Sequence, residues 1–476
     1  MALDISRRFA TRLVGVAVAL SVALRLPQLR GDIYVDEAEY AHIARQWAHG
    51  ARLYRDVSLD RPQLLLVLFR GLNRLGYLSS VPLRGFMMAW GAALIVAVAW
   101  LVRTAGGSWR AVAATSLLLA WFSSSKFFDG QFVNGELLAA LPSVLCLCVG
   151  LTAFRRSRRT ALLVAAGLLG GVAVLFKQSG IDGFAALCLW TVFGGRPMTK
   201  VSDRAKDACR LVGGFGVAIG IAAVHGATLG FSAWVHAMVG ARLDQAGSSG
   251  SAGLADRLVT SLNDYGPYAV GLAAGVILAA IHLRRTSATT PLLWTWLAMG
   301  GAAFLAGGGY SRHYYQALFP AACTLCGLAI DRLWTGHRPA VAMIAGLSVL
   351  PLALGGAPMF TGGQSKVYRE ARRAAQYVKA ELPPDERLAS LFINHLAPSL
   401  ADRPVYPLEL TTIWQEVLPD RVGPVAATLD GPDRPVAVLV GKFDRWPAAA
   451  DPVKHALQAR YRSAHRVGVY TLFVVK

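Results

Sequence analysis

The sequence predicts a multi-span α-helical membrane protein that carries a small soluble α/β domain at its C-terminal end. Hydrophobic residues make up 54% of the 476 residues and charged residues make up 16%, against about 25% in ordinary soluble domains. Apolar runs of roughly 18 to 22 residues, long enough to cross a bilayer as helices, recur along most of the chain. From about residue 362 onward the pattern changes to short apolar strands, prolines and charged helices.

The first apolar run, residues 10–27, follows Arg7, Arg8 and Arg12. Because basic residues tend to stay on the cytoplasmic side, we expect the N-terminus in the cytoplasm and the segment 30–60 outside. We expect about 11 to 13 spans in total. The further spans are expected at residues 84–102, 110–126, 136–154, 160–177, 180–195, 210–230, 266–283, 291–308, 313–331 and 339–357.

Loop charges support one orientation of these spans. Basic residues cluster in the connections at 155–159, 196–210, 284–285 and 332–338. These connections alternate with four others, at 127–135, 177–180, 231–265 and 309–313. The positive-inside rule puts the first set in the cytoplasm and the second set outside. Topology thus explains most of the net charge of +20, so we expect membrane lipid as a partner and no nucleic acid.

Two segments are predicted to lie along the membrane surface. In residues 36–49 one apolar face recurs at helical spacing, Asp36-x-x-Glu39 resembles a helix-capping pair, and Gly50 can end the helix. Residues 62–78 are apolar, but a span there would set every later loop against its charges. We therefore interpret 62–78 as an interfacial helix.

The C-terminal segment reads as an independent domain, so we divide the chain into a membrane domain, 1–361, and an outer α/β domain, 362–476. "YREARRAAQYVKAEL" has the pattern of an amphipathic helix. "RLASLFI", "RPVAVLV" and "VGVYTLFVV" have the composition of strands. The span count places this domain outside the cell.

A set of polar residues is predicted to gather at the outer membrane face. They are Asp36, Glu37, Asp60, Arg61, Glu136, Lys177, Arg312 and His313. Each has an ordinary alternative role, such as capping a helix, snorkelling to the interface or packing among tyrosines. Together, however, cations at this face suit a lipid phosphate, and a carboxylate beside them suits a general base acting on a hydroxyl.

Four motifs carry a family resemblance: "VDEAEY" after the first span, "DRPQLL" about twenty residues later, "NGE" at a span entrance and "RHYYQALFPAA" before a late span. In this order they resemble the polyprenyl-phosphate-sugar-dependent glycosyltransferases of the GT-C fold, which include the protein O-mannosyltransferases and the aminoarabinose transferases of lipid A. The resemblance covers roughly residues 8–360.

By this resemblance Asp36 is the general base and Glu37 its acidic neighbour. Arg61 with Pro62 takes the place of a Lys-Pro-Pro segment near the lipid phosphate; arginine keeps the charge and can hold a phosphate through two hydrogen bonds. The resemblance implies a lipid-phosphate site made by Arg61, Lys177, Arg312, His313 and Tyr314. It implies a substrate and acceptor site made by Tyr40, Asp60, Asn134 and Glu136.

The implied reaction is an inverting displacement, in which Asp36 takes the proton of an acceptor hydroxyl and the oxygen attacks a sugar held on an undecaprenyl-type phosphate. No cofactor is expected to be required, although two acidic positions could hold a divalent cation. The implied partners are a polyprenyl-phosphate-linked sugar donor and an acceptor protein, glycolipid or cell-wall glycan. The implied location is the bacterial cytoplasmic membrane, with the active site outside.

Two other functions compete with this interpretation. A transporter or flippase for a lipid-linked sugar would carry polar residues in mid-span on discontinuous helices, whereas the charges here gather at span ends on one face. In a binding or scaffold protein the C-terminal domain would do the work. The sequence of that domain has no nucleophile–base pair, metal-ligand spacing or phosphate loop, which argues against this function. We expect the domain to help recognise the acceptor instead.

Overall fold

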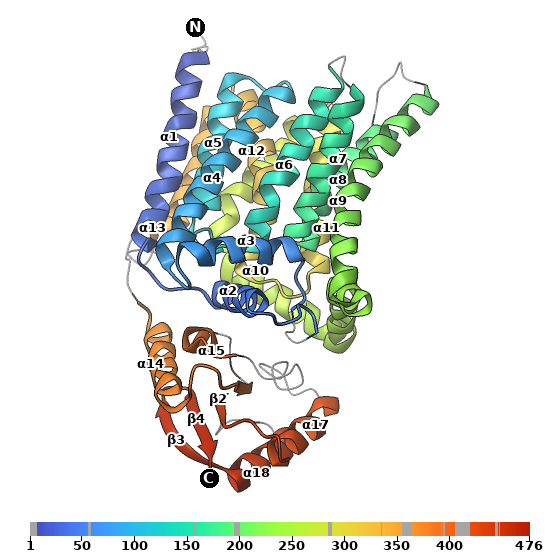
Figure 1. Cartoon of the computed structure of the whole chain (residues 1–476). Helices are drawn as coiled ribbons and strands as arrows, with labels where there is room; N and C mark the ends of the chain where they lie inside the picture. The colour runs from blue at the N-terminus through green and yellow to red at the C-terminus, as the bar shows by residue number, and fades with distance from the viewer. Residues whose placement is uncertain are drawn as a thin grey trace.

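The computed structural model describes residues 7–55, 59–155, 159–194, 200–283, 288–334, 336–354, 364–391, 393, 396–404, 419–442, 446 and 448–476. Within these residues the chain forms a bundle of long helices with a small sheet-containing domain at one end (Figure 1). The N-terminus lies at the opposite end of the bundle from that domain.

Each predicted span coincides with a helix, so the prediction of a multi-span helical protein is confirmed. In the described part of the chain, six helices are long and apolar enough to cross a membrane by themselves. The helices that match the spans are α1 (Arg7–Arg25), α4 (Ser80–Thr104), α5 (Trp109–Ser123), α6 (Gly135–Ala153), α7 (Arg159–Phe176), α8 (Asp182–Phe193), α9 (Val201–Val235), α10 (Ala241–His282), α11 (Thr290–Ala306), α12 (Phe319–Leu333) and α13 (Arg338–Leu354).

Helix α6 lies at the centre of this bundle. Its apolar stretch is 83% buried inside the protein, against 22% to 44% for the other long helices. Asn134 caps the helix, because its Oδ1 accepts a hydrogen bond of 2.8 Å from the backbone N–H of Leu137. The first turn of α6 therefore stands in the middle of the bundle end that faces the C-terminal domain.

Helix α2 (Val35–Ala48) lies across that end of the bundle (Figure 1), as predicted for residues 36–49. It buries Tyr40, Ile43 and Ala44 on one face, and Gly50 follows it with a φ of 101°. The predicted capping pair, Asp36 with Glu39, is wrong, because the helix begins two residues earlier. Glu37, not Glu39, accepts the backbone N–H that starts the helix, at 2.9 Å from Tyr34 N.

Helix α3 (Gln63–Leu75) also lies across the bundle end instead of along it (Figure 1). Its buried residues recur at helical spacing, at Leu65, Leu66, Phe69 and Leu72. The Asn73 side chain ties it to α2 by donating to the Ala41 carbonyl at 2.7 Å. The interpretation of 62–78 as an interfacial helix therefore fits this amphipathic arrangement.

The connection 231–265, expected as an outer loop, is helical instead. Helix α9 kinks at Gly230, which has a φ of 111°, and the chain passes through a π-helical turn, η4 (His236–Gly240), into α10. The physical reason is that aromatic residues beyond the kink have packing partners. Trp234 donates to the Gln63 side chain at 3.0 Å and so holds this part of the chain against α3.

The C-terminal segment forms a four-stranded sheet in the order β1-β2-β4-β3. Strand β1 (Leu388–Leu391) runs parallel to β2 (Ala437–Gly441), while β4 (Tyr470–Val475) pairs antiparallel with β2 and with β3 (Tyr461–Val467). Strands β1, β2 and β4 lie in the predicted segments. The sequence does not predict β3, an edge strand whose exposed polar residues break the apolar pattern. Within the described residues the sheet is accompanied by the helices α14 (Lys366–Glu381), α15 (Leu396–Ala401), α17 (Pro419–Asp430) and α18 (Asp451–Arg460).

This domain docks onto α2 and the loop before it. The Arg45 guanidinium on α2 lies 2.7 Å from the Asp402 carboxylate, and the Tyr77 hydroxyl donates to the Ser399 carbonyl at 2.7 Å. The Asp32 carboxylate accepts a hydrogen bond of 3.0 Å from the backbone N–H of Ser365, at the start of α14. The domain therefore covers the bundle end at which the predicted site residues lie.

Candidate active site

Several segments at the bundle end that faces the C-terminal domain meet around the first turn of α6. They are helix α2 and three short helical turns, η2 (Lys126–Phe128), η3 (Gln178–Ile181) and η5 (Arg312–Ala317). Turns η3 and η5 pack against α6, and η2 packs against η5. Each carries or adjoins a charged side chain, so the packing of the connections brings those charges together.

A buried arginine at the end of α1 fixes the connection that contains η2. Arg25 donates to the carbonyl oxygens of Gly130 at 2.7 Å and Ser123 at 2.8 Å, and to the Ser124 hydroxyl at 2.5 Å. Only glycine fits at 130, since a Cβ there would lie 2.1 Å from the Ser123 oxygen. The sequence does not predict this role for Arg25. An arginine at the end of a span is ordinarily interpreted as a snorkelling residue.

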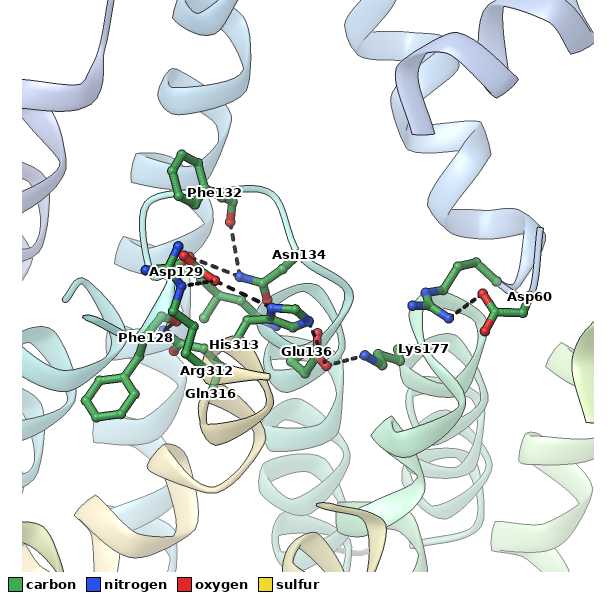
Figure 2. Close-up of polar contacts among 12 residues, drawn as sticks. Asp60, Phe128, Asp129, Phe132, Asn134, Glu136, Lys177, Arg312, His313 and Gln316 are labelled. Atoms are coloured by element: carbon green, nitrogen blue, oxygen red, sulfur yellow. Dashed lines mark hydrogen bonds and ion pairs between the residues drawn. The ribbon is translucent and has the colours of Figure 1, made fainter. Parts of the chain in front are cut away.

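The connection held by Arg25 places Asp129 among basic residues of η5. Arg312 Nε lies 2.8 Å from Asp129 Oδ2, and His313 Nδ1 lies 3.5 Å from the same oxygen. The other ring nitrogen of His313 lies 3.9 Å from Glu136 Oε1 on α6, and Glu136 is in turn paired with Lys177. Figure 2 shows acidic and basic side chains alternating along this row.

Lys177 is the last residue before η3 and is buried. Its ammonium group lies 4.3 Å from the ring centre of Tyr314, a cation–π contact. Gly135 leaves room for its stem, since a Cβ there would lie 3.0 Å from Lys177 Cδ. The predicted residues Glu136, Lys177, His313 and Tyr314 are therefore in one cluster.

Asp36 faces this cluster from the first turn of α2. Burial raises the pKa of its carboxyl above the ordinary value, and the nearby Glu136 adds to the rise. Three basic side chains, those of His313, Arg61 and Lys177, act against this rise. Electrostatic effects of this kind require the three side chains to lie near the Asp36 carboxylate. A half-buried carboxylate with a raised pKa and cationic neighbours has the properties of a general base.

Arg61 is held beside α2 by Asp60 and Tyr40, two residues that the family resemblance predicts to bind substrate or acceptor. Its guanidinium lies 2.5 Å from Asp60 Oδ1 and donates to the Tyr40 hydroxyl at 3.2 Å. Tyr40 is only 3% exposed, so in this geometry it orients Arg61. Glu39 lies in the same environment, where burial, with Asp36 contributing, raises its pKa to about 8.

Glu37, predicted as the acidic neighbour of the base in the catalytic pair, is bonded within the fold and is not free to take part in proton transfer. Its carboxylate is fully buried and accepts hydrogen bonds on both oxygens. The donors are the Arg84 guanidinium at 2.5 and 2.9 Å, Tyr34 N at 2.9 Å and Val133 N at 2.7 Å. Glu37 thus connects α2, α4 and the segment before α6, and it holds Asp36 in place.

Asn134 is likewise occupied, and the geometry does not support its prediction as a substrate-binding residue. Beyond capping α6, its amide donates to the carbonyls of Asp129 and Phe132, each at 3.2 Å. Figure 2 shows it beside the Asp129 end of the cluster. Its contribution is to shape the turn that presents Asp129 and Glu136.

Two large cavities in the described part of the protein share residues with this cluster. One, of about 320 Å³, is largely apolar and includes Glu136, Lys177 and Tyr314 together with side chains of η4 and α11. The other, of about 670 Å³, is lined by polar and apolar groups of the loop before α2, by Arg312 and by α14 and α15 of the C-terminal domain. The cluster is therefore accessible both from an apolar space in the bundle and from a polar space under the domain.

No family model and no curated protein matches this sequence, but solved structures do match its fold. ArnT from Cupriavidus metallidurans, bound to undecaprenyl phosphate, has a TM-score of 0.64 at 16% identity over 98% of both chains. The Archaeoglobus fulgidus oligosaccharyltransferase AglB, with an inhibitory peptide and a dolichol-phosphate, has 0.56 at 14% identity over 98% of this chain and 74% of that chain. The arabinofuranosyltransferase AftD from mycobacteria has 0.51 at 14% identity over 99% of this chain and 42% of that chain.

All three neighbours are GT-C proteins. The chain has the GT-C fold. The resemblance predicted from the motifs is thereby confirmed at the level of fold. In the GT-C bundle described above, Asp36, Glu136, Lys177 and His313 come from four different segments. Their convergence is a property of this tertiary structure and not of any one motif.

Proposed function

We propose that this protein is a membrane glycosyltransferase that moves a sugar from a polyprenyl-phosphate donor to an acceptor hydroxyl on the outer face of a bacterial cytoplasmic membrane. The observation that carries the proposal is Asp36, a half-buried carboxylate with a raised pKa, near Lys177, which lines the apolar cavity. The ligands bound in two neighbours support it, since ArnT was solved with undecaprenyl phosphate and AglB with dolichol-phosphate.

The apolar cavity suits the lipid part of such a donor. Its walls include Met238, Val239, Ala303 and Phe304, while Lys177 supplies positive charge where the walls become polar. A polyprenyl chain gains favourable free energy from apolar walls, and a phosphate group gains it from a desolvated ammonium. The donor phosphate would then lie near Lys177, with the sugar directed towards Asp36.

The chemical step we propose is a single displacement with inversion. Asp36 takes the proton of the acceptor hydroxyl as the oxygen forms a bond to the anomeric carbon. The bond between that carbon and the phosphate oxygen breaks, and its electron pair stays on the polyprenyl phosphate. General-base assistance of this kind contributes about 10²–10⁴-fold.

The departing phosphate gains negative charge, and cations around the site can stabilise it. Lys177, Arg61 and His313 all act on the Asp36 environment, and fixed charges in a site with little water are worth more than the same charges in solution. A neutralised phosphate monoester is a good leaving group, so we propose that the reaction requires neither a general acid nor a divalent cation.

A transfer assay tests the proposal. The purified protein in lipid is given a panel of polyprenyl-phosphate sugars and extracted envelope acceptors, and wild type is compared with Asp36→Asn. We expect the variant to lose at least about 10²-fold in rate while melting at the wild-type temperature. Asp203→Asn, an exposed residue far from the cluster, is the matched control and should transfer normally.

The same assay separates the proposal from its rival. Full transfer by Asp36→Asn would exclude Asp36 as the base. Movement of lipid-linked sugar across protein-containing vesicles, without transfer, would show a flippase. Wild-type activity is also expected to rise with pH through the raised pKa of Asp36, because only the carboxylate accepts the proton.

A further inference from the structure

The polar cavity under the C-terminal domain has no role in binding the donor as described above. We propose that it binds the acceptor, and that this acceptor is a glycan whose sugar rings lie between the loop before α2 and helix α14. The inference deepens the proposed function and rests on it. The volume of this cavity, about 670 Å³, is within the range of about 300–1,000 Å³ found for small-molecule sites.

The two walls of this cavity are fixed relative to each other. Asp32 on the bundle side accepts the backbone N–H of Ser365 at 3.0 Å, which anchors the start of α14. The Arg45–Asp402 pair at 2.7 Å and the Tyr77–Ser399 hydrogen bond hold α15 on the same side. The cavity is therefore a built space between two docked parts of one chain.

The cavity also borders the reacting groups. Tyr34 and Arg312 both line it. The Tyr34 hydroxyl is hydrogen-bonded to Arg312 and lies within electrostatic reach of Asp36 and Asp129. A hydroxyl group entering past Tyr34 would approach Asp36 from the polar side, while the donor occupies the apolar cavity that contains Lys177.

The lining has the mixed character that a sugar ring needs. Groups that can both donate and accept hydrogen bonds come from Gln28, Gln364, Ser365 and Tyr368, while Val35 and Val367 supply apolar surface. A pyranose or furanose has hydroxyls around its rim and C–H groups on its faces, so it can satisfy both kinds of surface at once. An apolar acceptor would displace water from this polar lining without replacing its hydrogen bonds, which costs free energy.

A peptide acceptor fits less well. Extended peptides are recognised mainly through main-chain hydrogen bonds, often at an open strand edge. The residues that line this cavity come from helices, helical turns and loops, and none belongs to a described strand. The lining thus offers side-chain amides and hydroxyls in place of a row of backbone groups.

The experiment blocks the cavity with a bulky label attached to α14. Val367 is 52% exposed and lines the cavity. Gln376, nine residues later and about 180° round the helix, is exposed on α14. Full-length Val367→Cys and Gln376→Cys proteins are each labelled with a bulky maleimide and compared with their unlabelled forms, so that folding is not in question. The native exposed Cys209 is labelled equally in both.

We measure the binding of three kinds of probe, which are an array of oligosaccharides, a panel of peptides, and undecaprenyl phosphate. We expect oligosaccharide binding to fall at least tenfold on labelling of Val367→Cys and to be unchanged on labelling of Gln376→Cys, with undecaprenyl phosphate binding unchanged in both. Equal effects of the two labels, or wild-type binding to peptides only or to neither panel, would overturn the inference. If the wild-type protein bound oligosaccharides but not undecaprenyl phosphate, the result would instead count against the proposed donor.

Discussion

Two buried ion pairs at the end of the bundle that faces the C-terminal domain differ in how completely their carboxylates are bonded. Glu37 accepts four hydrogen bonds, two of them from Arg84, and both its oxygens are occupied. Glu136 is paired with Lys177, but among the described residues its Oε2 has no hydrogen-bond partner, and the side chain borders the apolar cavity. We call the first pair saturated because its carboxylate is fully bonded, although Arg84 Nε has no hydrogen-bond partner among the described residues. The second pair is unsaturated at its carboxylate. A fully bonded carboxylate stabilises the fold, whereas an unsaturated one beside a cavity is able to bind a ligand.

The largest effect on stability is expected from Arg84→Met, which tests the saturated pair. Removing one partner leaves the other charge buried and costs about 3–5 kcal/mol. Thermal unfolding of the purified protein in lipid should show a large drop in melting temperature. The double variant Arg84→Met with Glu37→Gln should recover part of the loss, because no buried charge then remains unpaired. A wild-type melting temperature for the single variant would contradict the assignment of this pair to the fold.

Lys177→Met tests the unsaturated pair and should affect activity more than stability. Losing one group that stabilises developing charge typically costs about 10²–10³-fold in rate, so transfer should fall by that factor. The loss of stability should be smaller than for Arg84→Met, since Glu136 keeps His313 at 3.9 Å and borders a cavity that water can enter. Lys200→Met, at an exposed position, is the control. Equal destabilisation by Lys177→Met and Arg84→Met would remove the distinction between the pairs.

The smallest effect is expected from Glu39→Gln, measured as melting temperature against pH. The pKa of Glu39 is raised from 4.5 to about 8 by burial, with Asp36 contributing. Between these values the unfolded chain releases a proton that the folded protein keeps, so folding becomes less favourable as pH rises. The glutamine variant lacks this dependence, and its advantage over wild type should grow from about pH 5 to pH 8. An advantage that shrinks with rising pH would show that Glu39 is stabilised as a carboxylate.

The fold could be predicted from the sequence because the bilayer imposes simple rules. Apolar runs of sufficient length, and loops with a charge bias, locate the helices matching the spans, and α3 was recognised from the conflict it would create in the topology. The segment 231–265 was misjudged because its helices are supported by tertiary contacts such as Trp234 with Gln63. A composition pattern contains no information on such partners.

The site could be predicted only as a set of residue types on one face. Asp36 and Glu37 are neighbours in one motif, but successive helical residues point about 100° apart, so one faces the cluster and the other faces Arg84. Asn134 belongs to the same motif as Glu136 yet is consumed by capping α6. Which polar side chain is used by the fold depends on partners from distant segments, and these are fixed only in three dimensions.

Arg25 has a consequence for how the protein is made. Its guanidinium is bonded to groups of α1 and of the α5–α6 connection, at Ser21, Ser123, Ser124 and Gly130, which are synthesised about a hundred residues apart. Until that connection is in place, the arginine lacks these partners and must remain hydrated at the headgroup level. Helix α1 therefore reaches its final depth only after α4 and α5 have been inserted, which couples the earliest step of membrane integration to the completion of the candidate site.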